Sequence, residues 1–133
     1  MPVAVGVGLA VLVGLFAMAT GLDRDRAFYP VIAIIIATYY ILFAVVSDAS
    51  QALWPEITIA CAFIIAAVAG FKTSLWIVVA ALAAHGTLDL FHGSVVSNRG
   101  VPESWPAFCM GYDVAAAAFL AGLLKNGRIR TVA

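Results

Sequence analysis

Long apolar stretches alternate with short polar turns along the whole chain. Five of these stretches approach the roughly 20 apolar residues that a helix needs to cross a bilayer. They are Val3–Thr20, Phe28–Val46, Ala52–Phe71, Leu75–His92 and Ala107–Leu124. Charged and turn-forming residues gather between them, and the only long connection runs from residue 93 to 106. The pattern predicts an all-α membrane bundle of about five transmembrane helices, forming a single domain over residues 1–133.

The composition supports a membrane protein and limits the kinds of partner to be expected. Of the 133 residues, 65% are hydrophobic and 11% are charged, whereas soluble domains carry about 25% charged residues. The net charge is zero, so electrostatics gives no reason to expect a nucleic-acid partner. We expect membrane lipid to surround the protein. Because no Lys or Arg precedes Val3, the first stretch is expected to be a retained helix rather than a secretory signal.

The positions of Lys and Arg predict an orientation in the membrane. With five spans, one side of the bundle carries only Arg99, and the other carries Arg24, Arg26, Lys72, Lys125, Arg128 and Arg130. Cytoplasmic connections are enriched in Lys and Arg. We therefore expect a multi-pass protein of the cell inner (plasma) membrane, with its amino terminus outside, its carboxyl terminus inside, and the long loop outside.

Ionisable side chains inside the predicted spans are the candidates for function, because such residues are costly in a bilayer. His85, Asp89 and His92 are spaced by four and three residues, which places them on one helix face. Asp113 lies in the fifth stretch, and Glu56 lies near the start of the third. If the fourth and fifth helices pack antiparallel, His85 and Asp113 meet at a similar depth. The sequence predicts a polar site in the outer half of the bundle, below the long loop.

Imidazoles and carboxylates in this arrangement suit a divalent metal such as zinc or iron. Asp89 and His92 are the preferred ligands, and His85 with Asp89 is the other possible pair. His85 and His92 alone are two turns apart and too distant to share an ion. His85, Asp113 or Glu56 would serve as further ligands or as the acid–base group. The resulting hypothesis is a metal-dependent enzyme that acts on a lipid or another apolar substrate, with a metal-bound water as the nucleophile if the reaction is hydrolysis.

Two other classes of function remain open at this point. A transporter or channel subunit could relay protons or ions through the same residues, although the predicted inner half offers few polar steps. A non-catalytic subunit of a larger membrane complex, or a homo-oligomer, would need the cluster only as a hydrogen-bond network between helices. Glu56, after Pro55, also suits the positive end of a helix. Arg99 is expected to pair with Glu103, with an anionic lipid headgroup as the alternative partner.

One part of the chain resembles a known group of proteins. The matching positions are His85, Asp89, His92, Asn98, Gly100 to Pro102, Trp105-Pro106, Phe108-Cys109 and Asp113, together with the FYP of Phe28 to Pro30. This pattern is similar to a family of small bacterial multi-pass membrane proteins for which no activity is established. The resemblance covers about a third of the chain, so it implies a membrane protein and lends no function.

Overall fold

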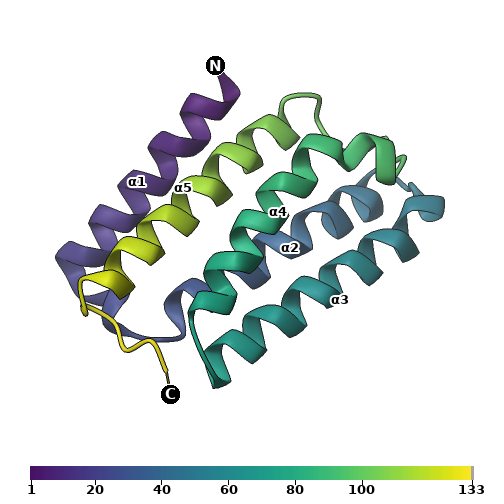
Figure 1. The fold of residues 1–133 in the computed structure, drawn as a ribbon. Coiled ribbons are helices and arrows are strands. Elements are labelled where there is room, and N and C mark those ends of the chain that lie inside the picture. The colour runs from purple at the N-terminus through teal and green to yellow at the C-terminus, as the bar shows by residue number, and fades with distance from the viewer. Residues whose placement is uncertain (133) are drawn as a thin grey trace.

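The computed structural model describes residues 1–132 and shows five long helices (Figure 1). They are α1 (Pro2–Thr20), α2 (Phe28–Val46), α3 (Ser50–Lys72), α4 (Trp76–Val95) and α5 (Trp105–Lys125), with the short 3-10 helix η1 (Leu22–Arg24) after α1. All five are long and apolar enough to cross a membrane. The predicted all-α bundle is therefore confirmed. The multi-pass character is supported in the same way, and the choice of membrane stays a prediction.

The helices do not pack around one another equally. α1 packs on α5, α5 packs on α4, and α2 and α3 pack on each other and on α4 (Figure 1). Glycines allow the closest of these approaches. A Cβ at Gly6 would collide with the carbonyl oxygen of Phe108, and one at Gly111 would collide with that of Val3. The backbones of α1 and α5 thus lie in direct contact, as small residues permit in membrane bundles.

The outer faces of the helices are apolar, as expected for surfaces in contact with lipid. Leu12 in α1 is 65% exposed and Ile65 in α3 is 68% exposed. By contrast, six acidic or histidine side chains are at most 3% exposed: Asp23, Glu56, His85, Asp89, His92 and Asp113. This inversion of the usual soluble pattern agrees with a bilayer as the solvent.

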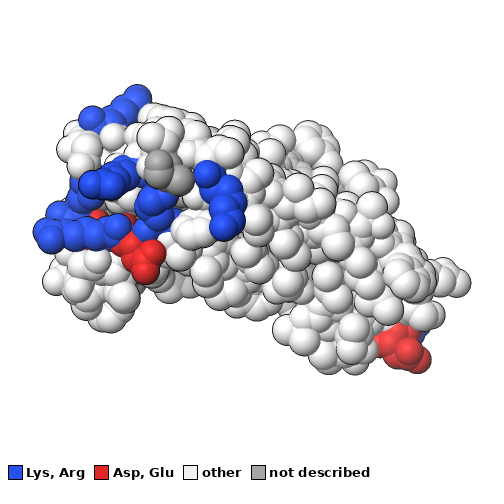
Figure 2. Space-filling view, turned by 90° about the horizontal axis from the view of Figure 1, so that it is seen from below, with Lys and Arg blue, Asp and Glu red and all other residues white. Residues whose placement is uncertain are grey.

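Lys and Arg gather at one end of the molecule (Figure 2). There the carboxyl-terminal tail meets the turns that follow α1 and α3. Arg128 donates to the buried carboxylate of Asp23, and this hydrogen bond raises the pKa of the guanidinium. Arg26 donates to the carbonyl oxygen of Phe71 at 2.9 Å and to that of Arg130. The charged end is thus held together, while its assignment to the cytoplasm stays a prediction.

At the opposite end, the loop between α4 and α5 folds back over the bundle. Val96 is buried in a small apolar cluster with Ala44, Ala49 and Ala52. A Cβ at Gly100 would collide with the carbonyl oxygen of Phe43, so the loop lies directly on the end of α2. The expected pairing of Arg99 with Glu103 is wrong. Arg99 instead donates to the carbonyl oxygens of Ser47 and Asp48, at 3.3 and 2.9 Å, because these groups end α2 beneath the loop.

Candidate metal site and the neighbouring polar group

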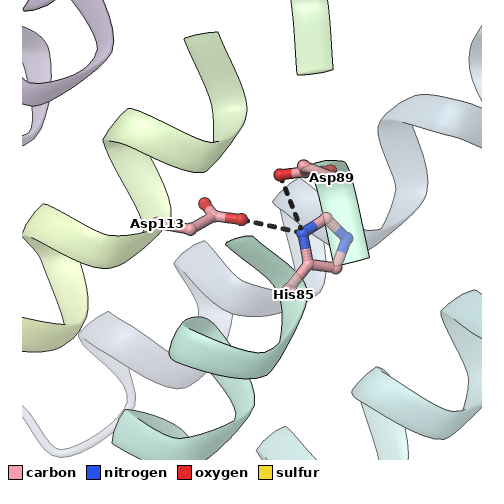
Figure 3. A group of neighbouring side chains, drawn as sticks. All are labelled: His85, Asp89 and Asp113. Atoms are coloured by element: carbon pink, nitrogen blue, oxygen red, sulfur yellow. Dashed lines mark hydrogen bonds and ion pairs between the residues drawn. The ribbon is translucent and has the colours of Figure 1, made fainter. Parts of the chain in front are cut away.

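Three buried side chains from α4 and α5 meet in the bundle interior (Figure 3). His85 Nδ1 lies 2.7 Å from Asp113 Oδ2 and 3.7 Å from Asp89 Oδ2. We call His85, Asp89 and Asp113 the inner triad. Spacing by four residues places His85 and Asp89 on one face of α4, and α5 supplies Asp113. A Cβ at Gly86 would lie 3.1 Å from that of Asp113, so the glycine lets α5 approach at this level.

The inner triad is not satisfied by its own hydrogen bonds. Asp89 Oδ2 and Asp113 Oδ1 are both buried and lack a hydrogen-bond partner. A buried carboxylate oxygen without a partner is costly, and a bilayer offers no water to relieve it. A buried oxygen without a hydrogen-bond partner needs an explanation, and a bound ion is a common one.

The chemistry of the donors fits a divalent cation. One imidazole nitrogen and two carboxylate oxygens lie within 4.8 Å of one another. Ligands bound about 2.1 Å from a single zinc ion lie at most about 4.2 Å apart, so the three atoms would need to close by no more than about 0.6 Å to surround one ion. Two positive charges would also neutralise the two carboxylates, which a single imidazole cannot do. Zinc and iron both accept this mixture of nitrogen and oxygen ligands.

Tyr40 of α2 closes one side of the triad. Its hydroxyl donates to Asp89 Oδ1 at 2.6 Å, and this oxygen is thereby satisfied. The ring of Tyr40 also stacks on His92, with centroids 3.8 Å apart and planes inclined by 11°. On another side, the Phe63 ring contacts the His85 ring edge-on, with the ring centroids 4.8 Å apart. Aromatic contacts therefore hold both histidine rings in place.

A second polar group lies between the triad and the long loop. His92 Nε2 lies 3.0 and 3.2 Å from the two carboxylate oxygens of Glu56. The Asn98 amide donates to Glu56 Oε1 at 2.8 Å and to the carbonyl oxygen of Tyr40 at 3.0 Å. We call Glu56, His92 and Asn98 the loop-side group. None of its buried side-chain polar atoms is without a partner in residues 1–132.

The five residues singled out from the sequence thus divide into two sets. The expected His/Asp cluster is present, and it consists of His85, Asp89 and Asp113. His92 and Glu56 pair with each other in the loop-side group. The assignment of Asp89 and His92 as shared ligands stays a prediction, as do the catalytic roles. Glu56 does not cap the start of a helix, because α3 begins at Ser50 and Pro55 lies within it.

Two residues that contact the candidate site, Tyr40 and Asn98, were not among the residues predicted for it. A signal for Tyr40 does exist in the sequence, because Ala33, Ala37 and Ala44 mark the buried face of α2 at spacings of four, three and four around it. No comparable signal identifies Asn98, since its side chain acts across the fold from an irregular loop.

An apolar groove of about 370 Å³ leads from the surface to the inner triad. Its walls come from α1, α2 and α5, and Asp113 is among its lining residues. The remaining lining residues are Leu9, Val13, Ile32, Ile35, Ile36, Tyr39, Trp105, Phe108, Cys109 and Tyr112. The groove thus borders the candidate site through Asp113, whose side chain is itself buried.

Comparisons with models of protein families, with curated proteins and with solved structures gave no match. The function of the chain is therefore inferred from its own geometry.

Proposed function

We propose that the protein is a small membrane-embedded metal-dependent enzyme that acts on a lipid or another apolar substrate. His85, Asp89 and Asp113 are the ligands of a divalent metal, zinc or iron. One observation carries this proposal. Three buried ligand atoms lie within 4.8 Å of one another, and one oxygen of each carboxylate has no partner.

A metal ion held by three protein ligands would keep a coordination position open and would supply Lewis-acid chemistry there. The residues of the chain provide the rest. Tyr40 fixes the rotamer of Asp89 by its hydrogen bond, as neighbours of metal ligands commonly do. Asp113 lines the groove and keeps one buried oxygen without a hydrogen-bond partner.

The accessory-subunit alternative predicts a polar network that satisfies itself internally. The loop-side group meets that condition, but the inner triad leaves two buried oxygens unsatisfied. A relay through the membrane would need polar residues toward the charged end as well. Below His85, the buried residues of α4 are Leu82, Ala81 and Val78, which are apolar. Both alternatives therefore explain the geometry less well than a bound ion does.

Metal analysis of purified protein tests the proposal. The samples are wild type, Asp89→Asn and Asp113→Asn, each stripped with chelator and then reloaded with zinc or with iron(II). We expect about one ion per chain in wild type and a loss of tenfold or more in both variants. Glu56→Gln is the matched control, because it removes an equally buried carboxylate from the loop-side group, and it should keep the ion.

Two results would overturn the metal site. One is a near-zero content in the reloaded wild type, and the other is an equal content in all four proteins. Gel filtration of each variant shows whether it remains folded, so that a loss of metal is not confused with a loss of structure.

A further inference from the structure

The groove opens toward the lipid rather than toward water. Leu9 of α1 is 42% exposed and Ile35 of α2 is 49% exposed, and both lie on its walls. The main contacts of α1 are with α5, and those of α2 are with α3 and α4, so the two walls stand apart. Because both walls are apolar faces of membrane-spanning helices, the mouth between them faces acyl chains of the bilayer.

Two polar atoms without partners belong to residues that line this groove. Trp105 Nε1 is an unsatisfied donor at the loop end, and Asp113 Oδ1 is an unsatisfied acceptor further along α5. They are eight positions apart, which corresponds to about 12 Å along a helix. Buried indole N–H groups usually find a hydrogen-bond partner. A groove with an apolar lining and a few placed polar groups is the usual form of a small-molecule site.

We propose that the groove binds one acyl chain of a bilayer lipid, which enters sideways between α1 and α2. The ester carbonyl of the lipid accepts a hydrogen bond from the Trp105 indole, and the chain runs along α5 to Asp113. A hydrocarbon core about 30 Å thick gives each leaflet about 15 Å, so an ordinary chain reaches that depth. The inference rests on the proposed function, for which it names the substrate class. It also places the inner triad beside the chain rather than beside the headgroup.

The surroundings of the groove favour a lipid over a protein occupant. Its exposed walls belong to helices long and apolar enough to cross a membrane, so acyl chains are the molecules that surround them. A helix from a second copy of the chain is the other occupant, and the experiment below separates the two.

Photocrosslinking in nanodiscs of phosphatidylglycerol tests the inference. The lipid carries a diazirine at the middle of one acyl chain, and adducts are mapped by mass spectrometry. Two variants fill the groove, Leu9→Trp and Ile35→Trp. Their matched controls are Leu12→Trp and Ile65→Trp, which place the same ring at lipid-facing positions outside it. We expect adducts on α5 between Cys109 and Asp113 in wild type and in the controls, and at least a fivefold loss in the filled variants.

The inference is overturned if wild type shows no adducts on this part of α5, or if the filled variants keep them. A dimer that is present in wild type and lost in Leu9→Trp would show a second copy in the groove, and would also overturn it. Metal content is measured on the same samples. Groove adducts without metal would refute the proposed function alone, whereas metal without groove adducts would refute only the lipid site.

Discussion

The inner triad and the loop-side group use the same chemistry in opposite ways. Each pairs a buried histidine with a carboxylate from another helix, at 2.7 Å for His85 with Asp113 and at 3.0 Å for His92 with Glu56. In the loop-side group, Asn98 adds a donor, and every buried polar atom has a partner. In the triad, a second carboxylate takes the place of that donor, and two carboxylate oxygens remain without a hydrogen-bond partner. The first arrangement satisfies itself, and the second leaves two acceptors free, as the proposed metal site requires.

The location of each group agrees with this division. The loop-side group joins α3, α4 and the loop, and through the Tyr40 carbonyl it also joins α2. It therefore fixes the end of the bundle. The triad joins only α4 and α5 directly, and it borders the groove through Asp113. Tyr40 connects the two, since it donates to Asp89 and stacks on His92.

The largest effect is expected from His85→Leu, studied in metal-free protein. This change removes the only imidazole of the triad and strands two buried carboxylates on α4 and α5. Breaking a buried ion pair by removing one partner typically costs about 3–5 kcal/mol. Unfolding in detergent micelles measures the loss. His92→Leu should lose less, because the Asn98 amide still donates to Glu56. Equal losses in the two variants would contradict the division between the groups.

Asn98→Ala is expected to come next. It removes the amide donor to Glu56 and to the Tyr40 carbonyl, and the acceptor for the Gly100 N–H at 3.1 Å. Buried groups left unsatisfied cost about 1–3 kcal/mol. The loop should also exchange its amide hydrogens faster, while metal content stays at the wild-type level. Ser97→Ala, at an exposed neighbouring position, is the control. Loss of metal in Asn98→Ala would show that the two groups form one site.

The fold and part of the site followed from the sequence for clear physical reasons. Apolar length defines a membrane span, and the expected and observed bounds of α2 agree at Phe28 and Val46. The last helix begins at Trp105 rather than Ala107 because Pro106 suits its first turn. Helical spacing placed His85 and Asp89 together, and a direct antiparallel connection brought Asp113 to their level.

The remaining contacts depend on rotations that a single sequence does not determine. Tyr39 and Tyr40 are adjacent, so they point about 100° apart on α2, and only packing decides which one enters the interior. His92 lies on the same stripe as Asp89, yet it turns to Glu56 because α3 passes beside it. The partner of Asn98 lies 42 positions away in the chain, and no local pattern encodes that contact.

Tyr40→Phe separates stability from metal binding at the residue that joins the two groups. It removes one hydrogen bond, to Asp89, and keeps the stacking on His92. Hydrogen bonds between membrane helices average about 0.6 kcal/mol, so the loss of stability should be small. Metal affinity should fall about 10- to 100-fold, because Asp89, a proposed ligand, loses the hydrogen bond that fixes its orientation. Tyr39→Phe is the control, since it removes the neighbouring hydroxyl, which makes no hydrogen bond to the triad in the described residues. An unchanged metal affinity in Tyr40→Phe would remove Tyr40 from the site.

The smallest effect on stability is expected from Asp113→Asn in metal-free protein, although the same change should abolish metal binding. The substituted amide retains an oxygen that can accept from His85, and its nitrogen replaces the unpartnered Oδ1 by a neutral donor. The change also removes one of two like charges that flank a single imidazole. Its free energy of unfolding should therefore lie within about 0.5 kcal/mol of wild type, or slightly above it.

This expectation reflects a general property of functional sites, which hold groups that the folded state alone would not favour. Asp23→Asn is the informative comparison, because the carboxylate of Asp23 is satisfied by Arg128 at the charged end. That variant should be clearly destabilised while it keeps the metal. If Asp113→Asn instead loses as much stability as Asn98→Ala, then the triad holds α4 and α5 together as a structural network. In that case the protein is better explained as an accessory subunit than as an enzyme.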